Sequence, residues 1–150
     1  MKKYKIQKEY IDYGCGFPIK LINVPMIYVR DIWTPNIKYN TYMEAVSKIL
    51  AEKLSRLTGN ELHFIRGYFE MTLQMFAKRF SVSHVAVLKW EKMENKPTSM
   101  NWATEKDIRL FILSKIGSRS KEFVTLYEAL EEEKNSATKT IELDAQELAA

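Results

Sequence analysis

The chain has 150 residues, of which 46% are hydrophobic, enough for one compact domain with a buried core. No apolar run reaches the roughly 18 residues of a membrane-spanning helix, and no continuous apolar segment of the signal-peptide kind follows the Met-Lys-Lys start. We therefore expect a cytoplasmic protein with no membrane partner. Cys15 is the single cysteine and excludes an internal disulfide. With only His63 and His84 as histidines, we expect no metal site and no cofactor.

The net charge of +4 conceals an asymmetry along the chain. Residues 1–121 carry 21 basic and 11 acidic side chains, a net charge of +10, whereas residues 122–150 carry 2 basic and 8 acidic ones, a net charge of −6. A basic body is what polyphosphate binding requires, but a charge excess spread over a whole domain is also typical of simple solubility. Composition alone leaves both interpretations open.

The N-terminal region, residues 1–38, predicts an arm followed by a small β-hairpin. Residues 1–13 alternate basic with aromatic or aliphatic side chains, which suits either an edge strand or a loose basic arm. Two β-rich runs follow, on either side of Pro25. Residues 23–25 separate the two runs, and because proline cannot donate to a strand ladder, we expect Pro25 at the bend of the hairpin or on a sheet edge.

Residues 39–117 predict a helical domain. The clearest amphipathic pattern covers residues 41–57, with apolar side chains every three or four positions. Gly59 is suited to a left-handed stop after this helix. Thr58 and Glu61 have the spacing of a capping box that opens the next helix.

The last third of the chain predicts two more helices and a tail. The apolar face of residues 108–116 is where we expect two copies of the chain to meet. Residues 118–150 predict a C-terminal helix from about Ser120 to Glu133 and then an acidic mobile tail, because only residues 140–143 show a short alternation there. The expected fold class is therefore mainly α, with five or six helices and a small N-terminal β-hairpin.

Residues 72–91 carry the pattern on which the functional prediction depends. Thr72 and Ser83 can each cap a short helix, and a tight turn joins the two helices. Apolar side chains at helical spacing are expected to face inward between them: Leu73, Phe76, Ala77, Phe80, Val82, Val87 and Trp90. Two helices packed in this way form a helix-turn-helix, and the outer face of the second fits the major groove of DNA.

From about Tyr10 to Leu113 the chain resembles the HigA/MqsA-type antitoxins of bacterial type II toxin-antitoxin systems, a branch of the Xre/Cro helix-turn-helix superfamily. The matching motifs are Tyr13-Gly14-Cys15-Gly16-Phe17, Val24 to Val29, Leu57-Thr58-Gly59-Asn60-Glu61, Phe64-Ile65-Arg66, Phe76-Ala77, Val82-Ser83 and Val87-Leu88-Lys89-Trp90-Glu91. The resemblance implies a DNA-binding antitoxin that neutralises a cognate RNA-cleaving toxin and represses its own operon.

Some positions depart from the family pattern. Leu73 stands where the family has a phosphate-contacting Gln, and Ser81 and Met93 stand where it has Gly. The zinc that MqsA carries in its N-terminal domain is not expected here, because Cys15 alone cannot supply its ligands.

The outer face of the second predicted helix is where we expect DNA contacts. The side chains expected to read base edges are His84, Val85, Ala86, Leu88 and Lys89. Those expected to contact phosphate oxygens are Thr72, Gln74, Lys78, Arg79, Ser83, Lys92 and Lys96. The alternative is an ordinary solvated helix face, for which the three apolar side chains are poorly suited. The expected partner is double-stranded operator DNA, bound by a homodimer whose half-sites lie about 34 Å apart.

Other functions remain open from the sequence. The chain could be a stand-alone Xre-family transcriptional regulator without a toxin partner, or an interaction adaptor. An enzyme is not expected, because no nucleophile, base and orienting group converge in the sequence. Toxin binding would fall either to the hairpin and N-terminal arm or to the acidic tail.

Overall fold

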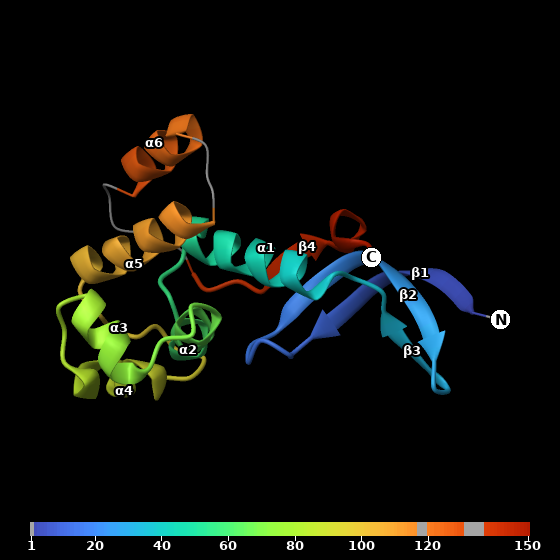
Figure 1. Ribbon diagram of the computed structural model, residues 1–150, viewed down its shortest axis with the longest axis horizontal. Helices are drawn as coiled ribbons and strands as arrows, with labels where there is room; N and C mark the ends of the chain where they lie inside the picture. The colour runs from blue at the N-terminus through green and yellow to red at the C-terminus, as the bar shows by residue number, and fades with distance from the viewer. Residues whose placement is uncertain (1, 117–119, 131–136) are drawn as a thin grey trace. The chain divides into compact units, whose positions relative to one another are not determined.

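The computed structural model describes residues 2–116, 120–130 and 137–150 (Figure 1). Its contacts divide the chain into two compact units. Unit 1 comprises Met1–Ala45 and Thr140–Ala150, and unit 2 comprises Val46–Lys139. This division groups the two ends of the chain together, whereas the boundaries expected from the sequence place them in separate regions.

Unit 1 is built on a four-stranded mixed sheet. Its strands are β1 (Lys3–Asp12), β2 (Ile19–Val29), β3 (Ile32–Pro35) and β4 (Ile141–Asp144). β2 is central, with β1 antiparallel to it along one edge. Along the other edge β4 pairs parallel with residues 19–22 and β3 pairs antiparallel with residues 26–29. The predicted fold class, mainly α with a small N-terminal hairpin, is therefore wrong, because the sheet is larger and draws a strand from each end of the chain.

The bend predicted at residues 23–25 is also wrong, because these residues continue β2. Pro25 lies between the positions that pair with β4 and those that pair with β3, and it faces Ile6 of β1. Its carbonyl accepts a hydrogen bond from the backbone N–H of Asn36 at 2.7 Å. A proline is tolerated inside this central strand because, on the side of β2 that pairs with β4 and β3, it lies after the residues that pair with β4 and before those that pair with β3. No ladder hydrogen bond from its nitrogen is needed there.

A change of phase in β2 explains why its sequence resembles two strands. Asn23 has a φ of 54°, in the left-handed region that Asn tolerates better than most residues. The regular alternation of inward and outward side chains is interrupted there. The buried positions before and after it are Ile19, Leu21, Val24 and Met26.

The tail predicted to be mobile is wrong for residues 140–150, which complete the sheet of unit 1. Ile141 and Leu148 are buried, and a short 3-10 helix (Ala145–Leu148) follows β4. The N–H of Lys38 donates to the carbonyl of Leu148 at 2.9 Å, and the N–H of Ala150 donates to the carbonyl of Asn36 at 3.2 Å. The end of the chain is thus hydrogen-bonded to the segment that follows β3.

Helices make up unit 2. α1 (Tyr39–Glu52) enters it from unit 1, and the others are α2 (Gly59–Tyr68), α3 (Leu73–Arg79), α4 (His84–Glu91), α5 (Trp102–Lys115) and α6 (Ser120–Ala129). The acidic run Glu131–Glu133 lies outside the described residues. None of the helices in the described ranges is long and apolar enough to span a membrane.

The segment between α1 and α2 confirms the predicted capping box and corrects two other predictions, the role of Gly59 and the end of α1. Thr58 and Glu61 form the capping box, with the Glu61 N–H donating to Thr58 Oγ1 at 3.2 Å and the Thr58 N–H donating to Glu61 Oε1 at 2.9 Å. Gly59 is not a left-handed stop, because it is the first residue of α2 and its φ is not positive. The preceding helix ends at Glu52 and not at residue 57.

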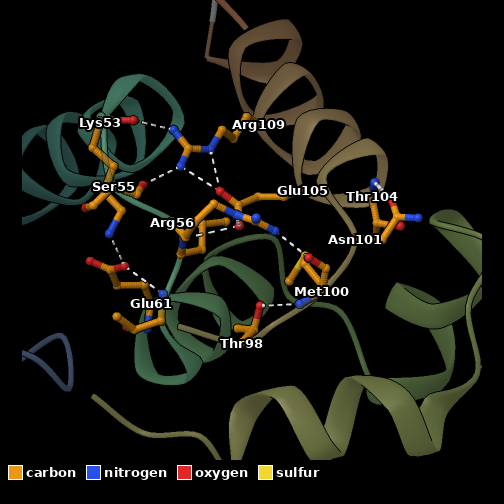
Figure 2. A network of polar contacts seen from close by, with 12 residues as sticks. Lys53, Ser55, Arg56, Glu61, Thr98, Met100, Asn101, Thr104, Glu105 and Arg109 are labelled. Carbon is orange, nitrogen blue, oxygen red and sulfur yellow. Dashed lines mark hydrogen bonds and ion pairs between the residues drawn. The ribbon is translucent and has the colours of Figure 1, made fainter. Parts of the chain in front are cut away.

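A buried ionic network accounts for the end of α1 at Glu52. Figure 2 shows its contacts. Arg109 of α5 donates to the carbonyls of Lys53 and Ser55, which lie in the loop after α1, and to the carboxylate of Glu105. The other carboxylate oxygen of Glu105 accepts from Arg56 Nε at 2.9 Å and from the N–H of Leu57 at 3.2 Å. The carbonyl groups that a longer helix would bond internally are therefore satisfied by a side chain from α5.

The apolar face of α5 belongs to the core of unit 2. Its buried side chains are Ile108, Phe111, Ile112 and Leu113. Because this face is already covered, it is not available as the contact between two copies that the sequence suggested.

Candidate nucleic-acid interface

Two short helices, α3 and α4, meet as the sequence predicts. Each begins after a residue whose hydroxyl accepts a hydrogen bond from the first turn. Thr72 Oγ1 accepts from the N–H of Met75 at 3.1 Å, and Ser83 Oγ accepts from the N–H of Ala86 at 3.1 Å. Both predicted caps are confirmed.

The connection between α3 and α4 is a turn of four residues, 80–83. It reverses the chain at Ser81, whose φ is 56°. The N–H of Val82 donates to the carbonyl of Ala77 at 3.0 Å, which closes the end of α3. Ser81 therefore occupies the left-handed position for which glycine has the lowest cost.

The inward faces of α3 and α4 are packed as the periodicity predicts. The buried side chains are Phe76, Ala77, Phe80 and Val87. The ring centroids of Phe76 and Phe80 lie 4.7 Å apart, and Phe80 meets Phe111 of α5 edge to face at 5.5 Å. Leu73, Val82 and Trp90, which were also predicted to face inward, are half-buried. The cluster of Phe76, Phe80 and Phe111 packs α3 against α5.

The outward face of α4 is left open to solvent. Five side chains were predicted to read base edges. Ala86 is half-buried, and the other four are exposed: His84, Val85, Leu88 and Lys89. Val85 is 59% exposed and Leu88 is 39% exposed, although both are apolar. Exposed apolar groups beside a cation and an imidazole are suited to a partner surface that offers methyl groups and hydrogen-bonding edges.

The side chains predicted to meet phosphate oxygens are also accessible. All seven are exposed: Thr72, Gln74, Lys78, Arg79, Ser83, Lys92 and Lys96. The acidic Glu94 is exposed in the same turn as Lys92 and Lys96. A polyanion that approaches the end of α4 would therefore meet both signs of charge there.

Arg79 differs from the lysines of this set because it is already engaged with the protein. Its guanidinium lies 4.9 Å from the ring centroids of both Phe80 and Phe111. It also lies 3.6 Å from the carboxylate of Asp107 on α5. Its contribution to an interface is thus to hold α3 on α5 while its remaining donors stay accessible.

A carboxylate on the last residue of α4 ties that helix to α2. Glu91 accepts from Arg66 Nε at 2.6 Å and Nη2 at 2.9 Å, and its other contact is His63 Nδ1 at 2.7 Å. Burial raises the pKa of Glu91, but hydrogen bonds and positive charge from Arg66 and His63 outweigh burial and hold that pKa below its ordinary value. Arg66 also donates to the carbonyl of Met71 at 3.0 Å. One arginine therefore joins α2, the turn after it and α4.

Gly59 allows the start of α2 to approach the end of α4 closely. A Cβ atom at this position would lie 2.6 Å from the carbonyl oxygen of Trp90 and 2.6 Å from the backbone nitrogen of Glu94. The N–H groups of Gly59 and Asn60 donate to the carbonyls of Lys96 and Glu94. The first turn of α2 thus orients the segment that carries Lys92 and Lys96.

Sequence reasoning assigned no role to the ion pair between Arg66 and Glu91 or to the close approach at Gly59. The signal available was that these residues lie in the motifs Phe64-Ile65-Arg66, Leu57-Thr58-Gly59-Asn60-Glu61 and Val87-Leu88-Lys89-Trp90-Glu91. Comparison of the chain with protein-family models, with curated proteins and with solved structures gave no match.

Proposed function

We propose that the chain is a sequence-specific DNA-binding antitoxin that places α4 in the major groove of its operator. The observation that carries the DNA-binding part is the open outward face of α4, where His84, Val85, Leu88 and Lys89 are exposed on a helix whose inward side is packed. Lys89 and His84 would supply hydrogen bonds to base edges, and Val85 would meet thymine methyl groups.

Most of the affinity in this proposal comes from the lysines around the two helices. Lys78, Lys92 and Lys96 are exposed, and each could neutralise one phosphate and release a counterion. These contacts would set the register of the protein on the duplex, while the outward face of α4 selects the sequence.

The toxin-neutralising part of the proposal comes from the resemblance to HigA/MqsA-type antitoxins. As such an antitoxin, the protein would bind an RNA-cleaving toxin encoded by the neighbouring gene and would repress the operon that encodes both proteins. Unit 1 would contact the toxin in this proposal, because the residues proposed to contact DNA all belong to unit 2. The proposal includes no catalytic step by this chain.

The DNA-binding proposal is tested with the duplex that precedes the gene. Lys89→Ala combined with His84→Ala should abolish specific binding in a fluorescence anisotropy titration, because both side chains lie on the outward face of α4. Lys48→Ala, at an exposed lysine of α1, is the matched control and should bind as the wild type does. Wild-type affinity in the double variant would overturn the assignment of α4 as the reading helix.

Salt dependence separates phosphate contacts from base contacts. Lys92→Ala combined with Lys96→Ala should weaken binding to every sequence and should reduce the slope of log affinity against log salt by about 1.8 per bound protomer, about 0.9 for each phosphate. An unchanged slope would contradict the role proposed for these two lysines.

The toxin part has its own test. The product of the neighbouring gene, when co-expressed with this chain, should co-purify with it and should arrest growth when expressed alone. Failure of both, with DNA binding intact, would replace the antitoxin proposal by a stand-alone transcriptional regulator.

A further inference from the structure

We propose that one end of the unit 1 sheet binds single-stranded nucleic acid. Bases of the strand would stack on Tyr28 and Trp33. Lys3 and Lys5 would neutralise its phosphates. The site belongs to unit 1, whereas every residue proposed to contact duplex DNA belongs to unit 2, so either binding activity can be lost without the other.

These four side chains share one face of the sheet. Tyr28 lies directly opposite Lys3 of β1 and directly opposite Trp33 of β3, and directly opposed residues of paired strands project to the same side. Lys5 follows Lys3 by two positions, so it projects to that side as well. The pairing of β1 with β2 is unbroken over this stretch, which ends before the left-handed Asn23 changes the phase of β2.

The cations and rings of this face are in contact. The ammonium group of Lys3 lies 5.4 Å from the ring centroid of Tyr28, and that of Lys5 lies 4.4 Å from the ring centroid of Trp33. The two ring centroids are 5.3 Å apart. Both aromatic residues are half-buried, whereas Met26 on the same face is 2% exposed. The rings therefore lie where the core of unit 1 ends and its solvent-facing surface begins.

A base can replace the lysine on each ring. Stacking of a base on an aromatic side chain is stronger than the contact of one exposed ammonium group with a ring. The displaced ammonium group stays within reach of the phosphate of the same nucleotide, because the lysine stem is flexible and its three donors can rotate. Ring and cation thus bind the two parts of one nucleotide, and every base is accepted because every base has a π-face.

The charges at this end of the sheet favour a nucleic-acid strand over a membrane surface. Residues 2–8 contain four lysines, and residues 28–35 contain Arg30 and Asp31, so the two segments together carry five basic groups and one acidic group, a net charge of +4. Arg30 and Asp31 form the turn between β2 and β3. Insertion of this turn into a bilayer would bury both charges, which is costly.

A single strand suits the site better than a duplex, because the faces of paired bases are covered by their neighbours and only unstacked bases can lie on an aromatic ring. The proposed contacts are to base faces and phosphates, which RNA and DNA share. Oligo-uridine and oligo-thymidine should therefore bind with dissociation constants within about threefold of each other.

Fluorescence anisotropy of the full chain with labelled strands of about 12 nucleotides tests the rings. Trp33→Leu should raise the dissociation constant about tenfold or more, whereas Trp33→Phe keeps a ring and should stay within about threefold of the wild type. Tyr4→Leu is the matched control. Tyr4 is 62% exposed and lies between Lys3 and Lys5 in the sequence, so it projects to the opposite face and its loss should leave binding unchanged. Far-UV circular dichroism confirms that each variant is folded.

The dependence on salt tests the lysines. Lys3→Ala combined with Lys5→Ala should reduce the slope of log affinity against log salt by about 1.4, about 0.7 for each phosphate of a single strand. Lys89→Ala combined with His84→Ala changes unit 2 only and should bind the single strands as the wild type does.

Four results would overturn the proposal. They are a wild type that binds neither oligonucleotide, a Trp33→Leu variant with wild-type affinity, a salt slope that is unchanged without the two lysines, and loss of single-strand binding in the unit 2 variant. Sedimentation with phosphatidylserine vesicles that Trp33→Leu abolishes, in a chain that binds no oligonucleotide, would instead assign the face to a membrane surface.

Discussion

Glu105 and Arg109, one turn apart on α5, form an ion pair in which neither side chain is exposed to solvent. Arg109 Nη2 lies 2.7 Å from Glu105 Oε2, and its Nε lies 3.1 Å from the same oxygen. Burial lowers the pKa of Arg109, and the nearby carboxylate only partly offsets this. The pair holds the loop after α1 against α5 through the carbonyls that Arg109 contacts.

Arg109→Met should lower the free energy of unfolding by about 3–5 kcal/mol, because it leaves Arg56 as the one remaining arginine that pairs with the buried Glu105 carboxylate and leaves the carbonyls of Lys53 and Ser55 without the Arg109 donor. Replacing Glu105 by Leu at the same time should recover part of this loss, since the second charge is then also removed. Lys115→Met, at an exposed position of α5, is the control and should change the free energy by less than about 0.5 kcal/mol. Urea unfolding measures all three. An equal loss in the single and double variants would contradict the reason given.

Gly59→Ala should lower the free energy of unfolding by about 1–3 kcal/mol, because the new methyl group would lie 2.6 Å from the backbone at Trp90 and Glu94. Gly67→Ala is the matched control on the same helix, because a Cβ there meets nothing within 4 Å. It should instead stabilise α2 by about 0.5–1 kcal/mol. Thermal unfolding of the two variants should therefore move in opposite directions, and equal shifts would refute the close approach.

Ser81→Gly should raise the free energy of unfolding by about 1 kcal/mol, because it removes the strain of a side chain at a φ of 56°. Ser83→Ala, two residues later, should lower it by about 1 kcal/mol through loss of the cap of α4. The comparison requires only chemical denaturation of the two variants. A destabilised Ser81→Gly would show that the serine contributes more through contacts than it costs in backbone strain.

Glu91 should make stability depend on pH below neutrality. Its pKa in the folded chain is lowered, so its contribution is complete above the ordinary value of about 4.3 and is lost as the pH falls toward the lowered value. Glu91→Gln should therefore be less stable than the wild type at pH 7 by about 1.5–3 kcal/mol, and this difference should shrink below about pH 4. Glu94→Gln, at an exposed carboxyl, is the control. A difference that did not change with pH would refute the assigned role of the Glu91 charge.

Local signals predicted the start of α2 and the pair α3 and α4 correctly, but not the end of α1 or the role of Gly59. The caps at Thr58, Thr72 and Ser83 depend on residues three positions apart, so the sequence contains the whole of each interaction. The helical spacing of Phe76, Phe80 and Val87 likewise predicted which face is buried. The candidate site was accessible to sequence reasoning because it is built from these local elements.

The sheet was not predicted because its determinants are distant from one another. Ile141 pairs with Ile19, and nothing near Ile141 identifies a partner so far away in the chain. The left-handed Asn23 interrupts the alternation of β2, so the one strand reads as two.

The place of β4 in the sheet also determines the order in which the chain can fold during translation. Unit 2 has all its residues before Thr140 has been added, whereas the sheet that contains the first 45 residues is complete only when β4, synthesised after unit 2, is available. A ribosome that stopped early would therefore release the helical part intact beside an unfinished sheet whose central strand, β2, lacked its neighbour along residues 19–22.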